Sequence, residues 1–449
     1  MRSTMFHHIG NQTCKLFSAF LLGMMSIAGS QSQQPLSIES AVARSLENNL
    51  GIQIARQQVE LAAIGDAWGA TGALPQIGLV ASASNAVSDQ SENPTSFIQD
   101  RLESESVNVG GQLNWLLFDG FGMFANKRSL EQLVKQADGQ AALVIEQTVA
   151  ATMLAYNAVL VQLALSDVLL SAMNVSRARL AWMDARKAIG AATTFERLQL
   201  DNGLLADSLA WWQQKANIEQ ATIALNRLMG ESVELEWELM SPLGVPEEID
   251  DFEGIRDRAL SNATVIQNAL ISLLIAETGV QQAQARMSPT LSLNANQNEQ
   301  LSRFNAGDLS GEGTTKNLAA NVVLNFNLFN GGATKRAIQQ AKIQVAMAEM
   351  QTVEERREVE RLLQDGISRW QAAERTYSIS DQLVSNSIWA LEIAQERLST
   401  GAINSLDFRD IQLQRLNAEQ QQVQALYAWH AADIELRRLS GAWTIEMPE

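Results

Sequence analysis

The sequence is poor in cysteine and histidine, and both shortages narrow the chemistry that the chain can perform. Cys14 is the one cysteine among 449 residues, and the histidines are His7, His8 and His430. Beyond residue 30 the chain therefore has no thiol and one imidazole, so it cannot form a disulfide bond or assemble the usual nitrogen and sulfur metal sites. We expect no metal, no cofactor and no catalytic residues, and we interpret His430 as an ordinary surface or packing residue.

Proline is also scarce, and its positions leave two long stretches of the chain uninterrupted. The seven prolines are at positions 35, 75, 94, 242, 246, 289 and 448. Proline interrupts helices, and between 122 and 230 and between 332 and 441 only glycines mark turns. Positions 121 and 190 are 69 residues apart, as are positions 332 and 401, which is roughly 100 Å at the helical rise. Two shorter helices could stack end to end along each long one.

Basic residues are outnumbered, since 33 Lys and Arg oppose 50 Asp and Glu and the net charge is -17. Such a chain repels nucleic acid. Within residues 1–30 the only charges are Arg2 and Lys15, residues 16–27 are apolar and residues 28–30 are small. This pattern predicts a cleaved export signal, and its removal would change the net charge to -19.

The chain is a tandem duplication. The corner Phe118, Asp119, Gly120, Phe121, Gly122 returns 211 positions later as Phe329, Asn330, Gly331, Gly332, and Gly190 returns as Gly401. At each corner the spacing of apolar residues changes from every second residue to every third or fourth. A strand therefore leads into the corner and a long helix follows it. Glycine suits a turn this sharp. We assign a signal peptide (1–30), repeat 1 (31–230), an acidic linker (231–253), repeat 2 (254–441) and a tail (442–449).

A strand pair precedes each corner, after a helical pattern that runs from about residue 36 to 72 in the first repeat. In the strands apolar residues alternate with Ser, Asn, Gln and Gly, as at Ile77, Leu79, Ala81 and Ala83 and again through Leu324, Phe326 and Leu328. We expect strands of roughly ten residues, the length that a tilted membrane strand needs. A soluble sandwich would alternate similarly, but its outer face would carry Lys and Glu.

Four strands cannot close a barrel, and an open sheet edge does not persist in lipid. The barrel must be shared between copies. Two copies give eight strands, whose side chains would fill the interior, whereas three give twelve and leave a channel. We therefore predict a homotrimer.

The long helices carry seams of small and apolar residues that step by three and four. In the first helix the seam is Leu130, Val134, Ala137, Ala141, Val144, Thr148, Ala151, Ala155 and Ala158, and in the second it is Ala373, Tyr377, Ser380, Val384, Ser387, Leu391, Ala394 and Leu398. The charge-free stretch 147–166 has a length that could span a membrane, but its Gln and Asn residues favour a buried position in a bundle. The linker, which is acidic and contains Pro242 and Pro246, is expected to lie over the helices.

Together, the signal peptide, repeated strand pairs, corners, long helices and glycine turns resemble the TolC family of outer-membrane efflux and export channels. The resemblance implies an α+β membrane protein in which a long coiled-coil helical barrel continues a twelve-stranded transmembrane β-barrel. It further implies a homotrimer in the outer membrane with its helices in the periplasm, a passive exit duct for efflux or type I secretion. The implied partners are outer-membrane lipid, a periplasmic adaptor and an inner-membrane pump or ABC exporter.

The same resemblance locates a site at the end of the tube farthest from the membrane. It implies an acidic entrance formed by Asp407 and Asp410, with Glu196 as the counterpart of Asp407. Residues three apart share a helix face. It also implies that the adaptor docks at the two turns, Gly190, Ala191, Ala192, Thr193 and Thr194 and Gly401, Ala402, Ile403, Asn404 and Ser405.

Other readings of these features remain. The acids could be a solvated helix face, or Asp410 could pair with Arg409 or Arg397 across an interface. The chain could be a secreted coiled-coil scaffold or adhesin with no channel activity. An enzyme has the least support, because Asp407 and Asp410 have no nucleophile or histidine beside them in the pattern.

Overall fold

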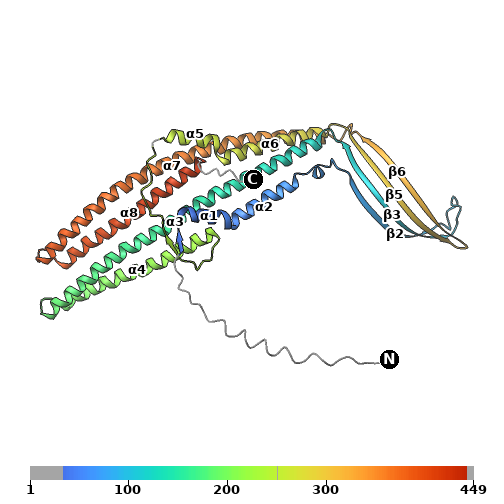
Figure 1. Ribbon diagram of the computed structural model, residues 1–449. Coiled ribbons are helices and arrows are strands. Elements are labelled where there is room, and N and C mark those ends of the chain that lie inside the picture. The colour runs from blue at the N-terminus through green and yellow to red at the C-terminus, as the bar shows by residue number, and fades with distance from the viewer. Residues whose placement is uncertain (1–33, 250, 442–449) are drawn as a thin grey trace, which may run out of the picture.

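The computed structural model describes residues 34–249 and 251–441, so the predicted signal peptide and the C-terminal tail lie outside the described residues. A four-stranded sheet forms one end of the molecule and two helical hairpins form the other (Figure 1). Each repeat has two short helices, a strand hairpin, a 67-residue helix and a returning helix. The elements of repeat 1 are α1 (Ile38–Asn48), α2 (Leu50–Gly65), a 3-10 turn (Trp68–Thr71), β2 (Gln76–Asp89), β3 (Arg101–Phe118), α3 (Gly122–Ala188) and α4 (Thr194–Met229). Those of repeat 2 are α5 (Phe252–Asn262), α6 (Thr264–Ala285), β5 (Thr290–Ala306), β6 (Leu309–Asn325), α7 (Ala333–Ser399) and α8 (Ser405–Leu439).

The sheet has the strand order β2-β3-β5-β6, and every neighbouring pair is antiparallel. The strands contain 14, 18, 17 and 17 residues, so the expected length of about ten was too short. The extra residues lie toward the hairpin ends, where both faces are polar and alternation gives no signal. The last strand was also placed wrongly at its other end, because β6 stops at Asn325 rather than continuing to Leu328.

The two faces of the sheet differ as the alternation predicted. Ile77, Leu113, Ala295 and Ala320 lie in register across the four strands on one face. One residue along, on the other face, the register joins Asn114, Asn294 and Asn321. Successive strand residues point to opposite faces, so one face is apolar and the other is lined by amides and hydroxyls.

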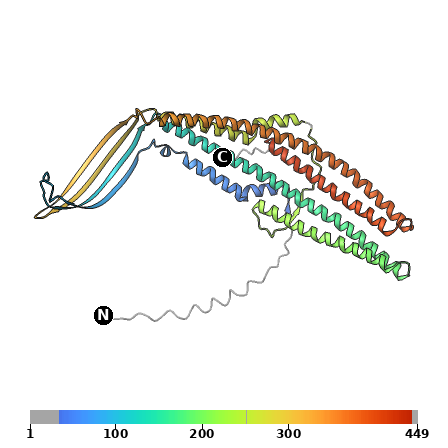
Figure 2. The same cartoon turned by 180° about the vertical axis from the view of Figure 1, so that it is seen from behind.

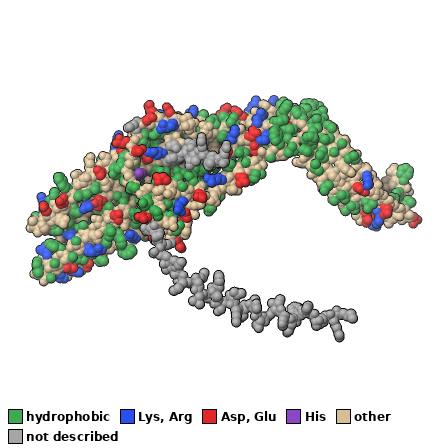
Figure 3. Space-filling view, in the orientation of Figure 1, with side chains coloured by type: hydrophobic (Ala, Val, Ile, Leu, Met, Phe, Trp, Pro, Cys, Tyr) green, Lys and Arg blue, Asp and Glu red, His purple; other side chains and the backbone are tan. Residues whose placement is uncertain are grey.

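The apolar face covers only the part of the sheet nearest the helices (Figure 3). On β5 and β6 it runs from Leu291 and Leu324 to Gln297 and Leu318, roughly 20 Å at the strand rise, and on β2 and β3 it continues to Ala83 and Val107. On β5 and β6 the same face then becomes charged, with the pairs Lys316–Glu299 at 3.4 Å and Arg303–Glu312 at 3.1 Å. The hairpin ends therefore extend beyond an apolar belt of bilayer-like height.

Each long helix is accompanied by shorter helices stacked end to end along it, as predicted (Figure 2). Near the sheet α2 packs on α3, and α4 packs on its distal half; α6 and α8 do the same for α7. The expected single helix over residues 36–72 was wrong, because the chain breaks at Asn49, whose side chain accepts a hydrogen bond from Gly51 N at 2.8 Å. An Asn side chain that caps a new helix satisfies amides left by the break.

The seam predicted for α7 is correct in its central part, where Ser380, Val384, Ser387, Leu391 and Ala394 are buried. The seam predicted for α3 was displaced, since of its positions only Ala141 is buried. The buried line of α3 is instead Ala141, Ile145, Val149, Thr152, Tyr156 and Val159. A helix in contact with neighbours on several sides has more than one apolar stripe, so its sequence does not single out the buried one.

By length and hydropathy α3 and the segment Phe252–Ala285 could each cross a membrane. In the structure, however, the charge-free part of α3 packs into the helical bundle: Tyr156 and Val159 belong to a core shared with Leu225 and Met229 of α4. The interpretation of residues 147–166 as a bundle segment is confirmed.

The acidic linker contains a short strand that the sequence did not predict. This strand, β4 (Trp237–Leu239), pairs in parallel with β1 (Gln34–Leu36) at the start of the described chain. Tyr156 ties the pair to α3, because its hydroxyl donates to Leu36 O at 2.9 Å and accepts from Ser241 N at 3.0 Å. A buried tyrosine with both bonds satisfied fixes the linker across the middle of the helices.

His430 holds another part of the linker, with its Nε2 2.6 Å from the carbonyl oxygen of Gly244. Burial lowers the pKa of His430 below its ordinary value of 6.5, against smaller opposing effects of the Gly244 carbonyl and Asp433. The unfolded chain therefore binds this proton more readily than the folded one, so the stabilisation is complete above pH 6.5 and is lost as the pH falls through the folded pKa.

We expect amide protection in residues 242–248 to be weaker at pH 5 than at pH 7.5, measured as hydrogen-exchange protection factors. His430→Gln should remove most of this difference. Equal protection at the two pH values in the unsubstituted protein would contradict the role of His430.

Candidate functional site

The tip of the first hairpin is a glycine-terminated helix followed by a capped one. Gly190 has φ +75°, and the next amide, Ala191 N, donates to Arg186 O at 2.9 Å. This pattern ends a helix on a residue that favours glycine. The next helix begins at Thr193, whose side chain and that of Glu196 cap one another's backbone amides.

The tip of the second hairpin repeats this design. Gly401 has φ +72°, and Ala402 N donates to Arg397 O at 2.8 Å. Asn404 caps α8, and the amide of Asn404 donates in turn to Asp407 Oδ2 at 3.4 Å. The two tips lie at the same end of the molecule, remote from the sheet (Figure 1).

The three acids predicted for the entrance are all exposed at these tips. Glu196 and Asp407 each occupy the third helical position and complete a capping box, which gives both a structural role. Hydrogen bonds from the Thr193 amide and hydroxyl lower the pKa of Glu196. Asp410 makes no ion pair with any described residue of its own chain.

Apolar side chains surround the tips and were not singled out from the sequence. Ile189, Phe195 and Leu406 are all more than half exposed. They lie next to the turns 190–194 and 401–405, so each tip presents a small apolar surface beside polar caps.

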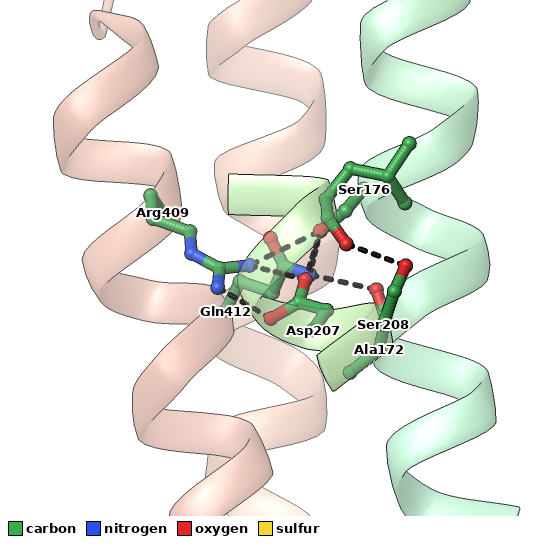
Figure 4. Close-up of polar contacts among 7 residues, drawn as sticks. Ala172, Ser176, Asp207, Ser208, Arg409 and Gln412 are labelled. Carbon is green, nitrogen blue, oxygen red and sulfur yellow. Dashed lines mark hydrogen bonds and ion pairs between the residues drawn. The ribbon is translucent and has the colours of Figure 1, made fainter. Parts of the chain in front are cut away.

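A buried polar network joins the two hairpins just inside the tips (Figure 4). Arg409 of α8 donates to both carboxylate oxygens of Asp207 of α4, at 2.8 and 2.6 Å. Ser176 of α3 donates to Asp207 at 2.6 Å, and Gln412 donates to Ser176 at 3.0 Å. The side chains of Asp207 and Arg409 are 7% and 21% exposed, so the pair is largely withdrawn from water.

This network was missed by the sequence reasoning: within the chain Arg409 pairs with Asp207. A signal was present in the repeat. At the repeat offset Asp207 corresponds to Ala418 and Arg409 corresponds to Leu198. Each of these two opposite charges stands where the other repeat has an apolar residue, and this difference could have marked the pair.

The first corner between sheet and helices is closely packed. Gly120 has φ +72°, and an added Cβ would lie 2.5 Å from Ala285 O, so a side chain cannot fit. Phe121 is the one described residue other than glycine with a positive φ, at 69°. Gly122 starts α3 beside the Asp119 carboxylate, and Phe118 ends β3 after a bulge. The glycines predicted for the turn are therefore required by its conformation or its packing.

The second corner is more open. Gly331 and Gly332 have φ +65° and +79°, and Asn330 Nδ2 donates to Thr334 Oγ1 at 2.8 Å. Phe329 is 86% exposed next to the apolar belt of the sheet. Aromatic side chains at that level are typical of a membrane interface.

Among residues 34–249 and 251–441, no group of three or more His, Cys, Asp or Glu is arranged to hold a metal ion. A sheet with one apolar and one polar face, joined end-on to long paired helices with capped tips, defines the class of outer-membrane channels with a helical tunnel.

Comparison with known proteins supports this class. Residues 255–442, essentially the second repeat, match the family model for outer membrane efflux protein. The chain is similar in structure to the Campylobacter jejuni CmeC outer membrane channel, with 17% identity, a TM-score of 0.73 and coverage of 92% of this chain and 87% of that one. The outer membrane protein VceC of Vibrio cholerae is 16% identical, with a TM-score of 0.71 and coverage of 90% and 96%. The open-state MtrE outer membrane channel of Neisseria gonorrhoeae is 15% identical, with a TM-score of 0.71 and coverage of 90% and 88%. No curated protein matches.

The resemblance to the TolC family is thereby confirmed, by sequence in the second repeat and by fold over the described chain. The matches support an efflux channel of the outer membrane. Proteins of this family transport and do not catalyse, in agreement with the prediction that the chain is not an enzyme.

Proposed function

We propose that three copies of the chain form a passive exit duct across the outer membrane and periplasm. The observation that carries this proposal is the sheet, which has one apolar face, one face of amides and hydroxyls, and open edges at β2 and β6. In lipid those edges require partners. Joining β6 of one copy to β2 of the next gives twelve strands, a wall wide enough for a water-filled lumen.

The helices also offer surfaces for neighbouring copies. On α4, Leu198, Leu205, Leu209 and Trp212 are at least half exposed and lie on one helix face. On α7, Ile379, Leu383 and Ile393 form a second exposed apolar stripe. Stripes of this kind in an exported protein are typical of interfaces, and we assign them to contacts between α4 and α7 of adjacent copies in a periplasmic tube. Residues 31–230 and 254–441 are then its two repeats, with 231–253 as the linker around its middle.

The tips are the proposed meeting point with the rest of an efflux or type I secretion machine. The exposed Ile189, Phe195 and Leu406 beside residues 190–194 and 401–405 favour docking of a periplasmic adaptor there. An inner-membrane pump or ABC exporter would supply the energy, because the chain has no nucleotide or metal chemistry of its own in the sequence. Asp407, Asp410 and Glu196 would line the entrance in threefold symmetry.

A double variant tests the entrance. Replacing Asp407 and Asp410 by Ala removes six carboxylates from a trimer, so cation selectivity in planar bilayers should fall severalfold because the local negative potential is lost. The matched control is Glu247→Ala with Glu248→Ala in the linker, which removes the same charge away from the tips. Unchanged selectivity in the tip variant would remove the acids from the entrance.

Fractionation of expressing cells tests the whole proposal. We expect the protein in the outer membrane, extracted by detergent as a trimer, with single-channel conductance after reconstitution. A secreted scaffold or adhesin would instead be recovered without detergent and would not conduct.

A further inference from the structure

A cavity of about 380 Å³ lies between the two hairpins, a few turns above their tips. Its walls come from α3, α7 and α8, and the apolar side chains that line it include Val175, Trp182, Leu391, Leu398 and Phe408. Its size is within the range of cavities that bind small molecules. Among its ten lining residues there are two arginines and no carboxylate.

One of those arginines, Arg179, is a buried cation without an acidic partner among the described residues. It is 8% exposed, its Nε atom is buried with no hydrogen-bond partner, and its NH2 group donates to the carbonyl oxygen of Ser405 at 3.2 Å. The nearby carboxylate of Asp207 is occupied by Arg409. Burial, and to a smaller extent repulsion from Arg409, lower the pKa of Arg179 to about 10, so it remains charged at neutral pH. Burying an uncompensated charge is costly.

The remaining contacts of Arg179 leave its charge uncompensated. Its Cζ atom lies 4.3 Å from the ring centroid of Phe408, a cation–π contact that holds the side chain against the cavity wall. The second lining arginine, Arg415, is already paired with Glu419 at 2.8 Å. The cavity thus combines apolar walls with one guanidinium that lacks an anion.

We propose that this cavity binds an amphipathic organic anion, a flat or chain-like apolar body with one carboxylate or sulfonate that pairs with Arg179. The apolar body lies against Trp182, Leu391 and Leu398, and the acid group supplies the negative charge that the guanidinium lacks. Both hairpins contribute walls to the cavity, so the anion binds the conformation in which the two hairpins are in contact. The site is independent of the proposed channel activity.

Calorimetric titration of the full chain in lipid nanodiscs tests the site, with 2-naphthoate as the probe and empty nanodiscs subtracted. We expect saturable binding of one molecule per chain, and at least about tenfold weaker binding of the neutral 2-naphthylmethanol, since a hydrogen bond to a charged group is worth about that factor. Arg179→Gln should weaken 2-naphthoate to the same degree, and Arg179→Lys should restore part of the affinity. Arg177→Gln, an exposed arginine on the same helix, is the matched control and should bind normally.

A second variant guards against an indirect effect of the charge. Leu398→Trp fills the cavity and keeps Arg179, and it should abolish binding while the protein remains an intact assembly by size-exclusion chromatography. Three results would overturn the proposal: no saturable binding, equal affinity for the acid and the alcohol, or unchanged binding in Arg179→Gln.

Discussion

Asp207→Ala is expected to raise the conductance of the reconstituted channel by more than tenfold. The substitution leaves Arg409 without its carboxylate, close enough to Arg179 for the two guanidinium groups to repel each other. Removing one partner of a buried ion pair costs about 3–5 kcal/mol, because the other charge remains desolvated. The least costly relief is separation of the α3–α4 and α7–α8 hairpins, which lets water reach both arginines and widens the entrance. Current through planar bilayers at low voltage measures this directly.

Two matched variants decide whether the ion pair is responsible. Asp201→Ala removes an acid of the same helix that pairs at 3.4 Å with Arg197 near the surface, and it should leave the conductance unchanged. The double variant Asp207→Ala with Arg409→Leu introduces the residue types found at the corresponding positions of the other repeat, Ala418 and Leu198. It should return the current most of the way to its original level, because no unpaired charge is left at position 409. If Asp207→Ala alone has the same conductance as the unsubstituted channel, the ion pair does not hold the hairpins together.

Val322→Arg is expected to abolish assembly in the outer membrane. Val322 is 65% exposed in the apolar belt, in register with Leu293 and Trp115. An arginine on the lipid face of a membrane barrel costs about 2–4 kcal/mol near the midplane, and in a trimer this cost is incurred three times. The amount of heat-resistant trimer in outer-membrane fractions is the measurement.

The adjacent residue provides the control. Asn321 points to the opposite face, in register with Asn294, so Asn321→Arg places the same charge in the lumen of the proposed barrel. That variant should assemble and shift ion selectivity toward anions. Equal trimer yield from the two variants would mean that both faces of the sheet contact water, as in the scaffold alternative.

Local residue patterns predicted much of the architecture. They failed where the sequence has no regular alternation or distinctive residue to mark a boundary. Alternation located the strands at Ile77–Leu79 and Leu291–Leu293, but not their hairpin ends, where Glu299 and Lys316 stand on the outward face and polar residues on the inward one. Gly190 and Gly401 marked the tips because the left-handed turns there favour glycine. Asn49 did not stand out as a helix break, since an asparagine within a helical pattern is common enough to carry no warning.

Part of the candidate site could likewise be predicted from the sequence, and part could not. Glu196 and Asp407 could be placed at the tips from the repeat, and their spacing from Thr193 and Asn404 is that of a capping box. The pairing of Arg409 with Asp207 could not be deduced, because the two residues are 202 positions apart and belong to different hairpins.

The sequence by itself determined the duplication, the order of strand and helix in each repeat, the faces of the sheet and the turns, because each depends on a period or a backbone conformation that neighbouring residues impose. Only the tertiary structure decided which stripe of α3 is buried, that the linker adds a strand beside β1, and that Arg409 is neutralised while Arg179 is not. These outcomes depend on which surfaces of distant segments come into contact. Burial and charge pairing result from that contact, and neither segment alone determines them.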